Sequence, residues 1–370
     1  MIVCHLTSVH SRYDTRIFLK ECISLSNHGF TTYLIVADNN GDEVNRNVSI
    51  IDVGKEHNRL NRIRITTKKI LNQALKINAD VYHLHDPELI PIGIKLKKRG
   101  KCVIFDAHED LPQQILSKPY LKKPIRKYLS KAIKIYERWS CSQFDAIVAA
   151  TPYIREKFAL INTNSIDINN YPIIDELANL KIDWSKKNNQ VCYLGGLSTV
   201  RGIKEIVAAI HESTSAAKLM IAGNYMEPGL EENLYKISGW ESTHFLGWLD
   251  RQNILQLMQA SNAGLVTLHP ISNYLDSLPV KMFEYMAAGI PVIASNFTLW
   301  EKIILDNECG LCVNPLAPEE IAQAIDFLIS HPEKAELFGR NGRNAVVNKF
   351  NWSIEENKLI SLYQNLKGRL

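Results

Sequence analysis

Residues 276–295 place two acids, a lysine and a proline ahead of an apolar run that predicts a buried strand. Pro279 fits the first turn of a helix, where a missing N–H costs nothing, and Gly289 fits its end. Lys281 and Glu284 lie three residues apart, on one face of this short helix. The arrangement suits a ligand with a phosphate group for the helix amides and Lys281, and a vicinal diol for Glu284.

Length and composition are those of a globular protein with two domains. The chain has 370 residues, 46% apolar and 22% charged. One core rarely serves so many residues, so we expect two domains. No apolar run approaches the roughly 18 residues of a membrane span. The apolar residues 1–6 indicate a buried strand rather than a secretory signal, which predicts a cytoplasmic protein.

The seven cysteines are odd in number and scattered, which favours reduced thiols over a disulfide framework. Cys309 and Cys312 have a suggestive spacing. However, no second pair accompanies them, as a zinc site would require, and they enter an apolar stretch rather than open a helix. We expect them to be core residues.

In both halves of the chain, apolar runs of about five residues alternate with stretches of helical period. This alternation predicts an α/β fold with two Rossmann-like, doubly wound domains. The predicted strands are 2–6, 32–36, 48–51, 81–84, 102–105, 146–149 and 165–168, then 191–194, 218–222, 244–246, 263–267, 291–294 and 310–313. We expect domains at 1–171 and 190–352, a linker at 172–189, and a helix near 353–370 that can pack back on the first domain.

Ligands of doubly wound sheets bind in the loops at the carboxyl ends of the strands. A dinucleotide fingerprint requires Gly-x-Gly-x-x-Gly after the first strand, whereas residues 7–16 contain no glycine. An enzyme that uses NAD or FAD is therefore disfavoured.

The loop at residues 7–16 also carries cationic and aromatic side chains. Asp14 can cap a helix that begins near Thr15 and ends at Gly29. Arg16 then sits in the first turn, where an unpaired cation opposes the helix dipole, so a bound phosphate or acidic acceptor would explain it better than helix stability does. The candidates for acceptor or phosphate contacts are His10, Arg12, Tyr13 and Arg16.

Several strand-end segments follow the order of one known family. They are residues 83–87, 106–109, 170–172, 193–202, 221–223, 245–247 and 276–295. Together they resemble the retaining glycosyltransferase family 4, of the bacterial polysaccharide or O-antigen type, over nearly the whole chain. The resemblance implies the GT-B fold, with two Rossmann-like domains facing a central cleft. It also implies transfer of a sugar from a nucleotide-diphosphate donor with retained configuration, and with no metal or other cofactor.

The resemblance assigns roles to the acids and cations of the donor half. Its two acids match Asp276, which would contact the donor sugar, and Glu284, which would hold the ribose. Its Arg and Lys on the diphosphate correspond to Gly196 and Arg201, so one cation is missing, and we infer that Lys281 supplies it. The other donor-binding candidates are Gly195, Gly223, Asn224, Trp248, Leu249, Ser277, Leu278 and Val280.

Three histidines follow or end predicted strands of the first half. The resemblance matches His108 to a histidine that hydrogen-bonds a donor-sugar hydroxyl, and His108 joins Asp276, Arg201 and Lys281 as a catalytic candidate. His83 and His85 alternate on one face of a strand end, where packing and capping explain them about as well as function. We retain His85 as an acceptor-side candidate, and with no obvious third ligand beside the pair we expect no metal site.

Residues 117–139 carry eight Lys or Arg and one acid, Glu137. The apolar residues at helical spacing among them are Leu121, Ile125, Leu129, Ala132, Tyr136 and Trp139. An ordinary surface helix packed on its domain would explain this stripe. Together with the basic balance of residues 1–171, however, it favours docking on anionic lipid, at about 1 kcal/mol per basic residue. Nucleic acid is disfavoured because no aromatic stacking platform accompanies the charge.

The resemblance implies a retaining, metal-independent glycosyltransferase, and with the basic helix we expect it to act on a glycan or lipid-linked acceptor in cell-surface polysaccharide synthesis, such as lipopolysaccharide O-antigen. We expect it to bind peripherally to the inner face of the cytoplasmic membrane. The alternatives are a noncatalytic subunit that binds nucleotide sugars, and an epimerase or phosphorylase of the same fold. The donor sugar, its base and the acceptor do not follow from the sequence.

Overall fold

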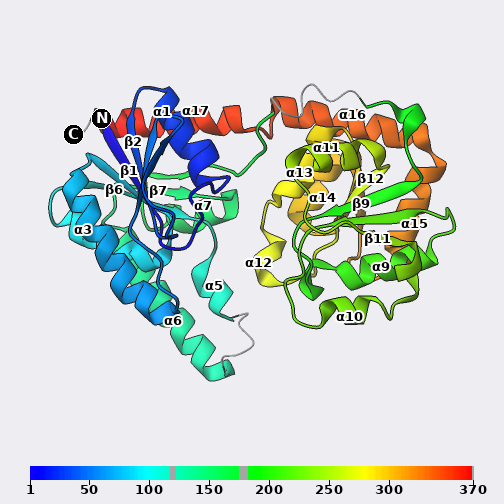
Figure 1. Cartoon of the computed structure of the whole chain (residues 1–370), viewed down its shortest axis with the longest axis horizontal. Helices are drawn as coiled ribbons and strands as arrows, with labels where there is room; N and C mark the ends of the chain where they lie inside the picture. Colours follow the sequence, from blue (N-terminus) through cyan, green and yellow to red (C-terminus); the bar gives the residue numbers. More distant parts are fainter. Residues whose placement is uncertain (117–121, 175–181, 369–370) are drawn as a thin grey trace. The chain divides into compact units, whose positions relative to one another are not determined.

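The computed structural model describes residues 1–116, 122–174 and 182–368, and divides the chain into two compact units (Figure 1). The first unit is Met1–Asn170 with Ser353–Leu370, and the second is Tyr171–Trp352. Each contains one sheet of mainly parallel strands together with helices. The predicted α/β class with two Rossmann-like domains is confirmed.

The sheet of the first unit has the order β3-β4-β2-β1-β5-β6-β7-β8 among the described residues. Its strands are β1 (Ile2–Leu6), β2 (Thr31–Val36), β3 (Glu43–Asn45), β4 (Val48–Asp52), β5 (Val81–Leu84), β6 (Cys102–Ala107), β7 (Ala146–Ala149) and β8 (Ser165–Asp167). β1 pairs in parallel with both β2 and β5. The loops after β1 and β5 therefore meet at one edge, where the strand order reverses and doubly wound sheets bind ligands.

Helices complete the first unit. They are η1 (Ile17–Cys22), α1 (Ile23–Asn27), α2 (Arg59–Asn61), η2 (Arg62–Thr66), α3 (Thr67–Ile77), η3 (Pro87–Leu89), α4 (Ile90–Lys97), α5 (Leu111–Leu116), α6 (Lys123–Cys141), α7 (Pro152–Ala159) and α17 (Trp352–Lys367). The Asp14 side chain accepts from the amides of Arg16 and Ile17, both at 2.9 Å, so its predicted capping role is confirmed. On α17, Tyr363 lies 2.8 Å from His83 Nδ1, which brings the end of the chain onto the first sheet.

The sheet of the second unit has the order β11-β10-β9-β12-β13-β14. Its strands are β9 (Gln190–Leu194), β10 (Lys218–Ala222), β11 (Thr243–Phe245), β12 (Ala263–Val266), β13 (Val292–Ser295) and β14 (Gly310–Val313). Its helices are η4 (Trp184–Lys186), η5 (Thr199–Arg201), α9 (Ile203–Glu212), α10 (Leu230–Leu234), η6 (Ser238–Ser242), α11 (Arg251–Ala260), α12 (Ser272–Leu275), α13 (Val280–Ala288), α14 (Thr298–Asp306), α15 (Pro318–Ser330) and α16 (Pro332–Asn348).

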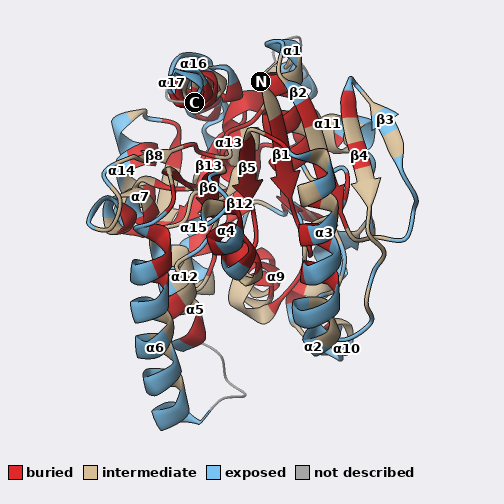
Figure 2. Ribbon diagram, turned by 90° about the vertical axis from the view of Figure 1, so that its left-hand side faces the viewer, coloured by how far each residue is buried: buried red, intermediate tan, exposed pale blue. Residues whose placement is uncertain are grey.

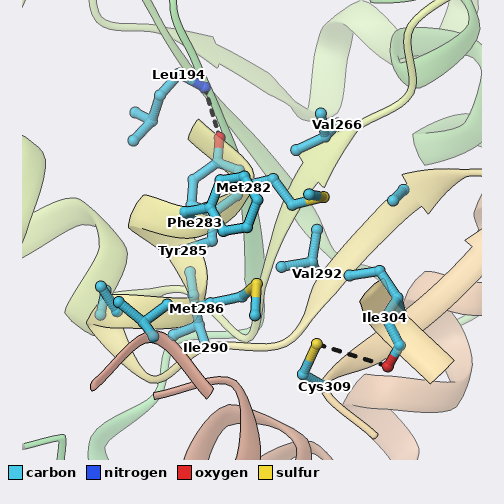
Figure 3. Packing of buried hydrophobic residues seen from close by; sticks show 14 of the residues in the cluster. Leu194, Val266, Met282, Phe283, Tyr285, Met286, Ile290, Val292, Ile304 and Cys309 are labelled. Atoms are coloured by element: carbon cyan, nitrogen blue, oxygen red, sulfur yellow. Dashed lines mark hydrogen bonds between the residues drawn. The ribbon is translucent and has the colours of Figure 1, made fainter. Parts of the chain in front are cut away.

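Helix α13 is fixed by a dense core (Figure 3). Pro279 directly precedes the first turn rather than lying in it as predicted, and Gly289, with φ +74°, ends the helix as predicted. The Tyr285 hydroxyl accepts from the Leu194 amide at 2.9 Å. Its ring covers Gly264 on β12, where an added Cβ would lie 2.3 Å from ring carbons. This packing sets the position of α13 relative to the end of β9.

The predicted strands all occur, with ends shifted by one or two residues where they differ. Strand β3 was not predicted. It pairs antiparallel with β4 at the sheet edge, and its partly exposed residues Glu43 and Asn45 give no apolar alternation to detect. The predicted basic helix begins at Lys123, and its residues 117–121, including Lys118 and Leu121, lie outside the described residues.

Candidate functional site

The loop after β9 and the first turn of α13 meet in the second unit. A Cβ added at Gly195 would lie 3.5 Å from Lys281 Nζ, so the two approach closely. Arg201 Nη1 donates to the Gly196 carbonyl at 3.2 Å, and the Tyr193 hydroxyl donates to the same oxygen at 2.9 Å. The predicted pair of cations, Arg201 and Lys281, therefore borders one glycine loop.

Lys281 is half-buried as a residue, but its Nζ is buried, and within the described residues this ammonium has no hydrogen-bond acceptor. The ammonium lies 3.8 Å from the centroid of the Tyr193 ring, a cation–π contact. Burial, followed by the nearby Arg201 guanidinium, lowers the pKa of Lys281 to about 7. Because a buried cation without a counter-ion is costly, the site is electrostatically prepared for an anion.

Gly196 stands where the resemblance would have an arginine. A Cβ there would lie 2.9 Å from Met226 Cγ and 3.0 Å from Arg201 Nη1. Met226 and Arg201 therefore occupy the space that a side chain at Gly196 would need. A second cation reaches the loop from α13 instead.

Glu284 is paired with Arg251, which the sequence did not single out. Arg251 Nη1 donates to Glu284 Oε1 at 2.7 Å, and both side chains are partly exposed. Arg251 is the first residue of α11, after the capping residue Asp250. Arg251 directly follows the loop of Trp248 and Leu249, two predicted donor-binding residues. Its place beside this loop was the only sequence feature that could have indicated a role for it. Glu284 can accept from a diol while Arg251 holds its other side.

The turn before α13 is already hydrogen-bonded. The amide of the donor-binding candidate Ser277 donates to Tyr274 O at 3.1 Å and is therefore not free to bind phosphate. The Trp300 indole donates to Ser277 O at 2.7 Å and fixes the turn. Asp276 caps the end of α12, and Leu278 packs against the core. The candidate phosphate donors at this turn are therefore the first amides of α13, which begins at Val280.

The loops after β10 and β11 supply the remaining donor candidates. Gly223, with φ +149°, is required by packing, because a Cβ there would lie 1.9 Å from the Gly195 carbonyl oxygen. Asn224 accepts through its carbonyl from the Leu197 amide at 2.8 Å. Trp248 is 72% exposed, whereas Leu249 packs against the core. The structure thus brings Gly223 to Gly195 and leaves Trp248 available to a ligand.

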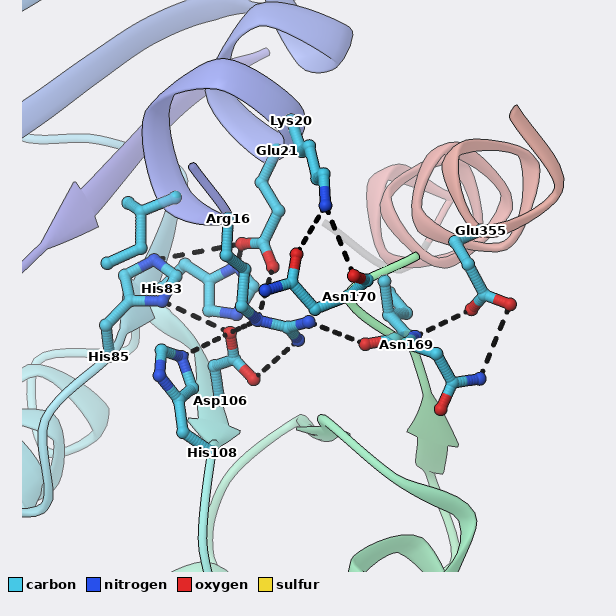
Figure 4. A network of polar contacts seen from close by, with 12 residues as sticks. Arg16, Lys20, Glu21, His83, His85, Asp106, His108, Asn169, Asn170 and Glu355 are labelled. Atoms are coloured by element: carbon cyan, nitrogen blue, oxygen red, sulfur yellow. Dashed lines mark hydrogen bonds and ion pairs between the residues drawn. The ribbon is translucent and has the colours of Figure 1, made fainter. Parts of the chain in front are cut away.

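In the first unit, His108 and His10 are neighbours, with ring centroids 5.2 Å apart. His108 Nε2 lies 2.9 Å from Asp106 Oδ2, and both histidines are partly exposed (Figure 4). Although burial opposes ionisation, the Arg16 guanidinium and then His108 hold the pKa of Asp106 well below its usual range. Asp106 therefore remains a carboxylate that orients the ring of His108.

Arg16 and Arg12 have partners inside the protein. Arg16 donates to both oxygens of Asp106 at 2.9 Å and to Ile168 O at 2.6 Å, and it is buried. The premise that Arg16 is unpaired was wrong, because its partner lies on a distant strand. Arg12 donates to both oxygens of Asp38, at 2.8 and 2.7 Å. Tyr13 is exposed.

His83 and His85 have companions that their local sequence does not show. His5 and Glu21 join them, with one possible ligand atom from each residue within 4.8 Å of the others. The expectation of no third ligand is wrong, because parallel pairing sets His5 opposite His83. Burial and nearby His85 lower the pKa of His5 and of His83 well below the usual value.

Helix α6 is exposed along most of its length (Figure 2). Its apolar stripe is exposed, whereas polar residues of the helix contact the rest of the first unit. Ser130 Oγ donates to Pro112 O at 2.9 Å, and buried Glu137 pairs with Lys157 at 2.6 Å. The exposed apolar residues are Ile125, Tyr128, Leu129, Ile135, Tyr136 and Trp139. The helix therefore packs on its domain, as the alternative of an ordinary surface helix has it, but not through the apolar stripe.

A basic pocket of about 450 Å³ opens beside α6. It is lined from α5, α6 and α7, and its cationic residues are Lys127, Lys131, Lys134 and Lys157. No helix within the described residues is both long and apolar enough to cross a bilayer.

The chain matches two family models. Residues 18–166 match "Glycosyltransferase Family 4", and residues 177–345 match "Glycosyl transferases group 1". An uncharacterized glycosyltransferase of Methanocaldococcus jannaschii is 24% identical over 217 residues, which are 56% of this chain and 53% of that protein. D-rhamnosyltransferase WbpZ of Pseudomonas aeruginosa is 27% identical over 286 residues, 72% of this chain and 68% of that protein.

The chain thus spans about half the length of the first of these relatives. Among solved structures, Anabaena Alr3699/HepE in complex with UDP-glucose has a TM-score of 0.73 at 14% identity, covering 99% of this chain and 100% of that one. That likeness establishes the fold, and the two family models together span most of the chain. The chain belongs to the glycosyltransferases of the GT-B fold.

Proposed function

We propose that this glycosyltransferase moves a sugar from a nucleotide-diphosphate donor to a hydroxyl of a glycan or lipid-linked acceptor, with retained configuration, in cell-surface polysaccharide synthesis. The observation that carries the proposal is the buried ammonium of Lys281, which lies near Arg201 and the glycine loop and has no hydrogen-bonding anion among the described residues. Anabaena Alr3699/HepE, which shares the fold, binds UDP-glucose.

Each part of the donor has a partner in the second unit. The diphosphate takes Lys281, Arg201 and the first amides of α13, and the ribose hydroxyls donate to Glu284. Asp276 contacts the sugar, and exposed Trp248 lies in the loop that reads the base. Because binding to the diphosphate restores a counter-ion to Lys281, recognition of this group is strongly favoured.

Transfer then requires stabilisation of the leaving diphosphate, whose negative charge grows as the bond to the sugar breaks. Arg201 and Lys281 provide this stabilisation electrostatically, so we expect no metal to be required. The acceptor hydroxyl attacks from the same face, and its proton passes to the leaving phosphate. His108, held by Asp106, donates to a sugar hydroxyl, and His10 beside it offers an acceptor-side contact.

A panel of UDP, GDP and TDP sugars tests the function. Thermal shift identifies the stabilising donor, and product analysis then measures hydrolysis or transfer by the purified chain. We expect Lys281→Ala to lose at least as much turnover as Arg201→Ala. A wild-type rate in the Lys281→Ala variant would refute the role of Lys281. No turnover of any stabilising donor without a partner protein would instead favour a noncatalytic subunit.

We also propose that α6 binds the chain peripherally to anionic lipid at the inner face of the cytoplasmic membrane. Its exposed apolar stripe, with Ile125 at 50% and Trp139 at 54% exposure, supports this. The lysines of the adjacent pocket are complementary to anionic headgroups. A lipid-linked acceptor would then reach the enzyme from the membrane.

Vesicle flotation tests this docking. The chain should bind vesicles that contain phosphatidylglycerol and should dissociate from them at high salt. It should not bind vesicles of phosphatidylcholine alone. Replacing Ile125, Leu129 and Trp139 with serine should abolish binding. The control is Leu160→Ser, since Leu160 is an exposed apolar residue outside α6. Equal binding to neutral and anionic vesicles would contradict the proposal.

A further inference from the structure

Three histidines and a glutamate converge inside the first unit. His5 lies on β1, Glu21 on η1 and His83 on β5, and His85 directly follows β5. All four side chains are fully buried. Figure 4 shows Glu21 reaching from its helix toward the histidines at the end of β5. Elements far apart in the sequence therefore deliver four potential metal ligands to one point.

The spacing of the donor atoms is close to that of a metal site. His5 Nδ1 and His85 Nε2 are 2.8 Å apart. Glu21 Oε2 lies 3.8 Å from His5 Nδ1, 3.9 Å from His85 Nε2 and 4.0 Å from His83 Nδ1. A tetrahedral zinc ion with nitrogen and oxygen ligands holds its donor atoms about 3.3 Å apart. The observed separations lie on both sides of this value, so small side-chain movements would close the site.

The same cluster contains buried polar atoms without hydrogen bonds. Within the described residues, neither side-chain oxygen of Glu21 accepts a hydrogen bond and Nε2 of His83 has no hydrogen-bond partner, while burial and the nearby Asp106 raise the pKa of Glu21 well above its usual value. Arg16 Nε approaches Glu21 Oε1 to 3.2 Å as an ion pair. Buried polar atoms are normally satisfied, because leaving them unpaired costs about 1–3 kcal/mol each. A cation bound among the histidines would provide a partner for the Glu21 carboxylate.

Outer contacts hold the imidazole rings, as they do around established metal sites. His85 Nδ1 lies 3.2 Å from Asp106 Oδ2, which leaves Nε2 facing the cluster. The Tyr363 hydroxyl lies 2.8 Å from His83 Nδ1 and 3.4 Å from His5 Nε2. His5 and His85 are thus each held on the nitrogen that faces away from the cluster, whereas Tyr363 contacts His83 on Nδ1, the same nitrogen that approaches Glu21.

We propose that His5, Glu21, His83 and His85 form a structural site for a divalent transition metal, with Zn²⁺ the best match. Imidazole and carboxylate ligands without a thiolate suit zinc, and four protein ligands leave no open position for catalysis. The metal would link β1, η1 and the end of β5, and through Tyr363 also α17. This site lies apart from the donor residues of the second unit, and it shares Asp106 with His108, because Asp106 contacts both His85 and His108.

Metal analysis of the full chain tests the proposal. The chain is stripped with chelator, loaded with Zn²⁺, dialysed and measured by elemental analysis and thermal unfolding. We expect one zinc per chain and a rise in Tm of about 5 °C or more. Loading with Co²⁺ should give the visible absorption of a tetrahedral site. No retained metal together with an unchanged Tm would overturn the proposal.

Glu21→Gln keeps the shape of the side chain and removes the anionic ligand. We expect it to weaken zinc binding by about 100-fold. The matched control is His244→Ala, since His244 is an exposed histidine on β11, and this variant should bind zinc as the wild type does. Equal zinc affinity in Glu21→Gln and wild type would also overturn the proposal. If Glu21→Gln does not fold, the stoichiometry and cobalt spectrum of the wild type decide.

Discussion

The ammonium of Lys281 lies 3.8 Å from the centre of the Tyr193 ring and, within the described part of the chain, has no hydrogen-bond acceptor. Tyr193 lies on β9, two residues before Gly195 of the glycine loop, and Lys281 belongs to the first turn of α13. The core beneath α13 therefore holds a buried cation at the edge of the sheet. In a glycosyltransferase, the donor diphosphate is the natural anion for this position.

Glu284→Gln should weaken the binding of UDP while preserving the binding of inorganic diphosphate. Hydrogen bonds to a charged group contribute about 1.5–3 kcal/mol, so we expect a loss of roughly 10- to 100-fold for UDP. Isothermal titration calorimetry measures both ligands. Glu212→Gln, at an exposed acid on α9, serves as control. An equal loss for both ligands would contradict ribose recognition by Glu284.

His108→Ala should lower kcat by about 100-fold and leave the Kd of UDP unchanged. UDP lacks the sugar that His108 is proposed to contact, so only transfer depends on this ring. Steady-state kinetics with the identified donor, together with UDP titration, separates the two effects. The exposed His57 provides a control in His57→Ala. A wild-type kcat in His108→Ala would show that His108 does not contribute to sugar transfer.

Gly264→Ala should destabilise the second unit. The added Cβ would lie 2.3 Å from Tyr285 ring carbons, and overpacking of this kind costs about 1–3 kcal/mol. Calorimetry should show a Tm lower by several degrees. In Gly368→Ala, the nearest atom to the added Cβ is 3.7 Å away, so stability should not change. Equal melting of the Gly264→Ala variant and wild type would show that Tyr285 can move without cost.

The sequence predicted the strands well because many of them contain buried apolar runs, as in β7 and β12. It missed β3, whose Glu43 and Asn45 are only partly buried. Local patterns also placed Lys281 and Glu284 on one short helix, because that requires only spacing, a proline and a glycine. The candidate site was accessible to sequence reasoning where its residues are close in the chain.

Pairings between distant residues were not accessible in this way. The sequence gives no partner for Arg16, whereas in the structure Arg16 pairs with Asp106 on β6. Arg251 likewise reaches Glu284 from the start of α11. Such contacts depend on strand order and helix packing, which spacing along one segment does not encode.

Proton uptake on UDP binding tests whether the donor diphosphate binds beside Lys281. The pKa of Lys281 is lowered to about 7 in the free protein, so at pH 8 most of its amines are neutral. A bound diphosphate raises this pKa, so each binding event should take up close to one proton at pH 8 and much less at pH 6. Titration calorimetry in buffers of different ionisation enthalpy measures this uptake.

Lys281→Met should bind UDP more weakly and without this uptake, since no titrating cation remains at the site. Comparing wild type with Lys281→Met at pH 8 is therefore the decisive measurement. We expect the wild type to take up nearly one proton on binding UDP and the Lys281→Met variant to take up nearly none. Equal proton uptake and equal UDP affinity in the two proteins would contradict a diphosphate grip built on Lys281.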